Sequence, residues 1–225
     1  MLVGEFRTNL VNLHASTAFR VKWFSIMCDK NNGDDLLRQL AGAANSVAEI
    51  SSYSMDRGVY AFFLVKGSLT IGHRVFAANN GTLLYVGKTE SSQKARDAGQ
   101  HLSDEGTGSS TLRRSLGAIL LEQLRLKPEA RSDSETSERR FTNYKFDTAG
   151  EEQLTKWMND HLSLAFCELP KLTIPELRAR EERLIKSAAP PLNILHNSGS
   201  PFYADLKLAR NHCVALAREA AKKNR

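Results

Sequence analysis

The run GVYAFFLV at residues 58–65 constrains the fold more than any other segment of the chain. Its eight residues carry no charge and include three aromatic side chains, so neither face of an extended strand would be polar. Antiparallel strands with one solvated face alternate between apolar and polar residues, whereas strands covered on both faces are continuously apolar. The sequence therefore predicts that this segment is a buried central strand.

Two further strands and four helices are predicted around it. Residues 82–87, TLLYVG, follow the turn signal Asn80-Gly81, and residues 162–169, LSLAFCEL, form another apolar run. Apolar residues at helical spacing predict helices near residues 93–102, 112–124, 149–158 and 177–188. The third helix is expected to begin with a capping box of Thr148 and Glu151, and the fourth with one of Thr173 and Glu176.

The chain divides into three regions. Residues 1–52 are expected to be an N-terminal α/β extension, with a strand at residues 19–27 and a helix that starts at Asp34. Residues 53–197 hold the predicted core domain with insertions. Residues 198–225 form a basic amphipathic helix, which is a candidate contact for a partner subunit. The oligomeric state is not predicted.

Length and charge narrow the functional classes. A chain of 225 residues with 41% hydrophobic content can bury a proper core. No apolar run approaches membrane-spanning length, and Glu5 and Arg7 interrupt the start of the chain, which predicts a cytoplasmic protein without a membrane partner. The net charge of +6 and pI near 9.3 favour a polyanionic partner, although charge alone carries little weight.

One carboxylate is out of place. In a helix over residues 177–188, Leu177, Leu184 and Ile185 share a face, and Glu181 lies in its middle. Burying an unpaired carboxylate costs at least several kcal/mol, so such a group is normally paired, protonated or bound to a metal. The structural alternative is an ion pair with Arg178 or Arg183.

Three motifs occur in order on these predicted elements. Gly58-Val59-Tyr60 lies on the first strand and Tyr85-Val86-Gly87 on the second, and the glutamate helix carries E-x-x-L-I-K followed by P-x-x-N, from Glu181 to Asn193. This set resembles the GIY-YIG nuclease superfamily over roughly residues 58–193. The resemblance implies an α+β fold with a small three-stranded antiparallel sheet flanked by helices. It also implies an endonuclease that cuts DNA phosphodiester bonds with one divalent cation, Mg²⁺ or Mn²⁺.

The resemblance also assigns roles to residues. Glu181 would hold the metal, and a single carboxylate suits Mg²⁺, which keeps most of its waters. Tyr60 and Tyr85 would position or activate water, and Tyr60 is the better candidate to take its proton. Arg96 would stabilise phosphate charge. The family places a histidine or tyrosine one helical turn after this arginine, but Gln100 stands there and His101 follows, so either Gly99 permits a distortion or the histidine role is lost.

Four more residues are candidate substrate contacts. Lys88 follows the second motif, and Arg113 and Arg114 begin a helix after a glycine-serine loop, where they could contact backbone phosphates. Their alternative role is solvated surface charge. Asn193 binds substrate or, as is more typical of an asparagine after two prolines, turns the chain. Two other functions stay open: a DNA-binding module of this fold that cuts poorly, and a partner-binding protein.

Overall fold

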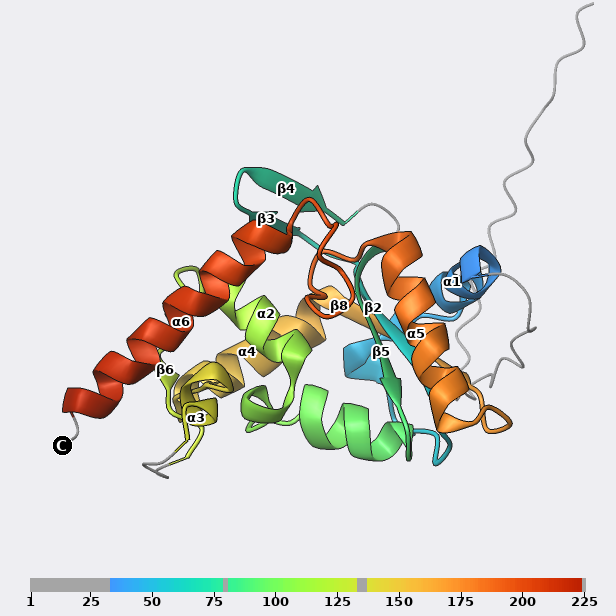
Figure 1. The fold of residues 1–225 in the computed structure, drawn as a ribbon, viewed down its shortest axis with the longest axis horizontal. Coiled ribbons are helices and arrows are strands. Elements are labelled where there is room, and N and C mark those ends of the chain that lie inside the picture. The colour runs from blue at the N-terminus through green and yellow to red at the C-terminus, as the bar shows by residue number, and fades with distance from the viewer. Residues whose placement is uncertain (1–32, 79–80, 133–136, 224–225) are drawn as a thin grey trace, which may run out of the picture.

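The computed structural model describes residues 33–78, 81–132 and 137–223, so the strand predicted at residues 19–27 lies outside the described part. Four antiparallel strands form the main sheet in the order β1, β8, β2, β5, of which Figure 1 labels β8, β2 and β5. Their bounds are Asn45–Ser46, Leu162–Glu168, Gly58–Leu64 and Thr82–Thr89. All seven residues of β2 are buried between β8 and β5, which confirms the predicted central strand.

The predicted α+β class, an antiparallel sheet flanked by helices, is confirmed, but the expected count of three strands is wrong. The fourth strand, β1, comes from the N-terminal extension and has two residues, which pair with Ser163 and Leu164 of β8. Two residues show no periodicity, so no sequence pattern could reveal this strand.

Alternate residues of β2 face two separate apolar clusters. Val59, Ala61 and Phe63 pack with residues of α1 (Gly33–Gly42) and α5 (Ile174–Ala188). Tyr60, Phe62 and Leu64 pack with residues of α2 (Thr111–Ile119), α4 (Thr148–His161) and α6 (Tyr203–Lys223). Because each face of the sheet has its own helical layer, the strand can be apolar throughout.

The remaining elements connect these layers. A hairpin of β3 (Ser68–Ile71) and β4 (Arg74–Ala77) lies between β2 and β5 in the chain. After α2 come β6 (Pro128–Glu129), α3 (Arg139–Thr142) and β7 (Lys145–Phe146), and the long helix α6 packs along α2, α3 and β6 (Figure 1). Single helical turns lie at η1 (Val47–Glu49) and η3 (Thr107–Ser109), and η2 (Lys94–His101) is a π-helix.

The helix that carries Glu181 begins as predicted. Thr173 and Glu176 form a reciprocal capping box, and Pro175 lies in the first turn of α5. Helix α4 differs, because Asp147 is its N-cap and accepts a hydrogen bond from the backbone N–H of Gly150. Glu151 cannot complete the box expected with Thr148, since its carboxylate contacts other buried groups.

The described part of the N-terminal extension belongs to the same core. Helix α1 contacts α5, β2 and β8, and β1 joins the sheet. The domain boundaries after residues 52 and 197 stay predictions. None of the described helices has both the length and the apolar character that a membrane span requires.

Candidate active site

The register of β5 sorts the second motif onto the two faces of the sheet. Tyr85 lies opposite Phe62 and Gly87 opposite Tyr60, so both point to the face that η2 and α2 cover. Lys88 lies opposite Val59 and points to the face of α5. Because β5 is the edge strand, groups from both layers can meet around its end.

The glycine of the second motif makes room for a tyrosine of the first. A Cβ placed on Gly87 would lie 2.4 Å from both Cζ and the hydroxyl oxygen of Tyr60. Such a contact is about 1 Å closer than two carbon atoms tolerate. The Tyr60 ring can therefore reach its place only over a residue without a side chain.

The Tyr60 hydroxyl is the meeting point of two further candidates. It lies 2.7 Å from Nε2 of His101 and accepts a hydrogen bond of 3.2 Å from Nε of Arg96. Tyr60 is fully buried, and its ring stacks on Tyr85 with centroids 6.3 Å apart. Residues from β2, β5 and η2 thus converge on one hydroxyl group.

The π-helix explains how His101 reaches this position. A regular α-helix would bring residue 100 back to the face of Arg96, whereas a helix with i to i+5 hydrogen bonds brings back residue 101. Arg96 and His101 both contact Tyr60, and Gln100 instead accepts a hydrogen bond from Nη1 of Arg96. A local distortion of the helix, the first of the two alternatives, is therefore what the structure shows.

His101 is held as a neutral imidazole. Its side chain is fully buried, with Nδ1 2.6 Å from Oγ of Ser110, which is also the N-cap of α2. Burial holds the pKa of His101 well below its usual 6.5, and the charges of Arg96, Arg113 and Arg114 act in the same direction. A neutral ring can accept a proton from Tyr60 at Nε2 and donate from Nδ1 to Ser110.

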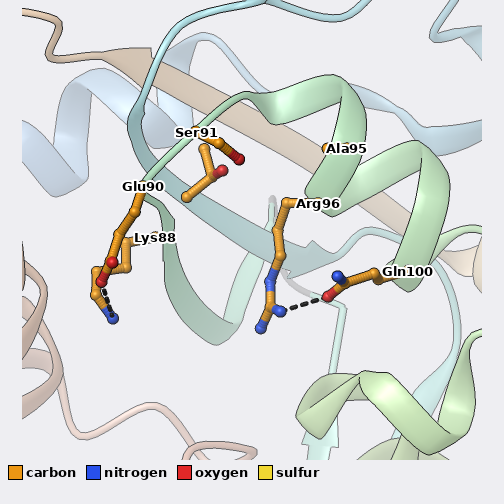
Figure 2. Close-up of a pocket in the computed structure, with 7 residues that line it drawn as sticks. Lys88, Glu90, Ser91, Ala95, Arg96 and Gln100 are labelled. Carbon is orange, nitrogen blue, oxygen red and sulfur yellow. Dashed lines mark hydrogen bonds and ion pairs between the residues drawn. The ribbon is translucent and has the colours of Figure 1, made fainter.

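Arg96 connects this cluster to an open cavity of about 300 Å³. Figure 2 shows Lys88 and Glu90 on one side of this cavity and Arg96 with Gln100 on the other. Arg96 is half-buried and lines the cavity. Its guanidinium donates hydrogen bonds to Tyr60 and Gln100, which fix its position on the cavity wall. A planar guanidinium in that position suits a phosphate group.

Glu181 has a cationic partner, although not the expected one. Its carboxylate is 14% exposed and forms an ion pair of 2.8 Å with Nζ of Lys88. The same amino group lies 3.7 Å from Glu90, which Arg178 binds with two hydrogen bonds. Lys88, rather than Arg178 or Arg183, thus compensates the carboxylate on the packed face of α5.

Tyr85 lies within electrostatic range of the same groups. Burial raises the pKa of its hydroxyl above 10.0, Arg96 lowers it and Glu181 raises it. Among the described residues, this hydroxyl has no hydrogen-bond partner, unlike that of Tyr60. The Tyr85 side chain is only 6% exposed.

Arg113 was wrongly expected at the surface. Its side chain is fully buried, and Nη2 lies 2.7 Å from Oε2 of Glu151. Thr107, Thr155, the carbonyls of His101 and Glu151, and the sulfur of Met158 accept its remaining hydrogen bonds. These contacts occupy the guanidinium, so it cannot contact a backbone phosphate.

Arg114 and Asn193 also have internal partners. Arg114 is 7% exposed and donates to the carbonyls of Thr107 and Gly108. The Asn193 amide accepts from the N–H of Val86 and donates to its carbonyl, while Leu192 donates to the carbonyl of Leu84. This segment closes the outer edge of β5, so the side chain of Asn193 has a structural role, although not the chain turn that was expected.

Comparison with models of protein families shows which family this chain belongs to. The model of the GIY-YIG catalytic domain matches residues 58–212, well over half of the chain. The chain belongs to this family. Membership indicates nuclease activity in general, and GIY-YIG nucleases generally depend on a divalent metal. Neither the curated proteins nor the solved structures give a match to this GIY-YIG protein.

This GIY-YIG domain offers a divalent metal ion the carboxylate of Glu181. No group of three histidine, cysteine or acidic side chains able to cage a metal occurs among the described residues. Mg²⁺ does not need such a cage, because it binds one or two carboxylates and completes its shell with water and phosphate oxygens. Glu181 already attracts a cation at 2.8 Å, the amino group of Lys88.

Sequence reasoning missed three residues around this site. Ser110 contacts His101, Glu90 lies between Lys88 and Arg178, and Gln100 holds Arg96. Ser110 has a signal, since it lies in the serine-threonine run that begins α2, but that run indicates only a cap. Glu90 and Gln100 are ordinary polar residues in sequence, and only their positions reveal their contacts.

Proposed function

We propose that this chain is a metal-dependent endonuclease that hydrolyses phosphodiester bonds in DNA. The observation that carries the proposal is the convergence of both motifs with Arg96, His101 and Lys88 at the end of β5, beside the cavity. Glu181 reaches the same place from the other face of the sheet through Lys88. Phosphodiester hydrolysis needs a metal ligand, a proton acceptor and fixed positive charge, and this set supplies all three.

Glu181 would hold Mg²⁺ or Mn²⁺ on this proposal. The bound ion would supply a Lewis acid for the scissile phosphate. Lys88 must leave the carboxylate when the metal binds, and its amino group then becomes available to a phosphate oxygen. Arg96, on the cavity wall, would bind the same phosphate and stabilise the charge that develops on it.

Tyr85 and Tyr60 would have different roles toward the attacking water molecule. Tyr85, whose ring stacks on that of Tyr60, would orient the water. Tyr60 would take its proton and pass its own to Nε2 of neutral His101, 2.7 Å away. Tyr60 is covered by Arg96 in this structure, so the transfer requires the guanidinium to move toward the phosphate.

Nicking of supercoiled plasmid DNA by the purified protein tests this function. The wild type is expected to nick with Mg²⁺ or Mn²⁺ and to stop when EDTA is added. Glu181→Ala should abolish nicking. Glu182→Ala is the matched control, because that neighbouring carboxylate pairs with Lys186 and His196 outside the site.

Two results would contradict the proposal. Metal-dependent nicking that persists in Glu181→Ala would place the activity elsewhere or in a contaminant. If the wild type binds DNA but cleaves none under any of these conditions, the protein would instead be a DNA-binding module that has the GIY-YIG fold. That alternative was motivated by the displaced histidine and by the basic C-terminal helix, and the contact of His101 with Tyr60 bears only on the first of these.

A further inference from the structure

Three arginines gather where η3, α6 and the segment after β6 meet. Arg114 lies in α2 and donates to the carbonyl of Gly108 at 2.8 Å. The side chain of Arg131 covers the same glycine, because a Cβ on Gly108 would lie 2.9 Å from its Cγ. Arg210 lies in α6, which packs along both α2 and β6. The three belong to separate segments of the chain, and the fold brings them together.

This arginine cluster, Arg114, Arg131 and Arg210, lacks compensating charge. No carboxylate of the described residues forms an ion pair with any of its three members. Nε of Arg114 is buried and has no hydrogen-bond partner among the described residues. Burial, together with repulsion by Arg210 and Arg131, lowers the pKa of Arg114 to about 10. Like charges held close together cost free energy unless an anion joins them.

Two members of the cluster also act electrostatically on Tyr85 of the second motif. Arg114 and Arg210 both lower the pKa of the Tyr85 hydroxyl, so their charges act on the same group as those of Arg96 and Glu181. Arg131 is exposed and Arg210 half-buried, which leaves the cluster open to a ligand from solvent.

We propose that Arg114, Arg131 and Arg210 bind a second phosphate of the DNA backbone, beside the scissile one. This inference rests on the proposed function, which makes DNA the ligand. Arg131 and Arg210 contact the phosphate from solvent, and Arg114 provides fixed charge beneath them. The cluster thereby fixes the direction in which the strand crosses the site.

The salt dependence of DNA binding tests this proposal. Binding of a fluorescent duplex is measured by anisotropy in EDTA, so that no strand is cut, across a series of salt concentrations. Each phosphate contact contributes about −0.9 to the slope of log K against log salt concentration. Arg210→Gln should make the slope shallower by about 0.9, which at 0.1 M salt corresponds to roughly eightfold weaker binding. Arg131→Gln should act in the same way.

Arg218→Gln is the matched control. It removes one arginine charge from the same helix, but Glu138 already neutralises that guanidinium at 2.7 Å. The control should bind DNA with the slope of the wild type. Arg210→Gln should also keep or raise the melting temperature, since it removes repulsion from Arg114. A lower melting temperature together with weaker binding would reveal a packing role and overturn the proposal.

The remaining outcomes separate this inference from the nuclease proposal. If the wild type nicks plasmid but Arg210→Gln matches Arg218→Gln in slope, the phosphate site is wrong and the nuclease stands. If the wild type binds DNA without nicking it, the nuclease proposal fails. The phosphate site is still supported in that case if Arg210→Gln makes the salt slope of binding shallower than that of the wild type. A wild type that binds no duplex refutes the phosphate site as well.

Discussion

Gly87→Ala is the substitution for which the structure makes the sharpest prediction. The added methyl would meet Cζ and the hydroxyl of Tyr60 at 2.4 Å, and the ring must move by about 1 Å to restore normal contact. Tyr60 is fully buried, so the displacement strains the core, and overpacking of this kind costs about 1 to 3 kcal/mol. It also disturbs the hydrogen bonds of Tyr60 to His101 and Arg96.

The activity should fall much further than the stability. A displacement of about 1 Å among catalytic groups lowers rates by roughly a hundredfold. Urea unfolding and the single-turnover rate of DNA nicking measure the two effects on one preparation. Gly199→Ala is the control, because a Cβ there meets nothing within 4 Å. A Gly87→Ala protein with wild-type stability and rate would refute the proposed reason for a glycine in the second motif.

Three other substitutions test separate parts of the structure. Glu151→Ala should lower the free energy of unfolding in urea by about 3 to 5 kcal/mol, because it leaves Arg113 buried without its carboxylate partner. The control Glu152→Ala, at an exposed residue, should lower it by almost nothing. Equal losses in the two variants would contradict the prediction. Asn193→Ala should cost about 2 to 4 kcal/mol, since it strips both partners from the backbone of buried Val86, and a loss below about 1 kcal/mol would disprove that role. The pKa of His101 is lower in the folded than in the unfolded chain, so the unfolded chain takes up this proton first. Unfolding free energy should therefore fall by up to about 1.4 kcal/mol per pH unit below pH 6.5, and His101→Gln, measured over the same range, should remove that part of the slope.

The main strands and the glutamate helix could be predicted because local patterns determine them. The continuous apolar run gave β2, and the capping box with proline gave the start of α5. The order of the motifs grouped distant residues correctly, since Tyr60, Tyr85, Arg96 and His101 do contact one another, while their role as an active site stays a prediction. A local sequence pattern predicts an element well when the residues that determine the element all lie in one segment.

Other features depend on partners far away in the chain. Arg113 looks like surface charge in sequence, but it is buried because Glu151, 38 residues away, accepts its hydrogen bond. A distortion that brings His101 into place could be stated only as one of two alternatives, and its form as a π-helix could not be predicted, because the contact with Tyr60 comes from a distant strand. The same holds for Glu181, whose partner Lys88 comes from another layer of the fold.

The central claim is that Glu181 holds the metal of a DNA-cutting site. The most direct test is the single-turnover rate of plasmid nicking against Mg²⁺ concentration for the wild type, Glu181→Gln and Glu182→Gln. The wild type and Glu182→Gln should saturate at similar concentrations. Glu181→Gln should be at least about a hundredfold slower and should need more Mg²⁺, because the metal contributes several kcal/mol to the transition state. The same rate and the same Mg²⁺ dependence in all three proteins would contradict the claim.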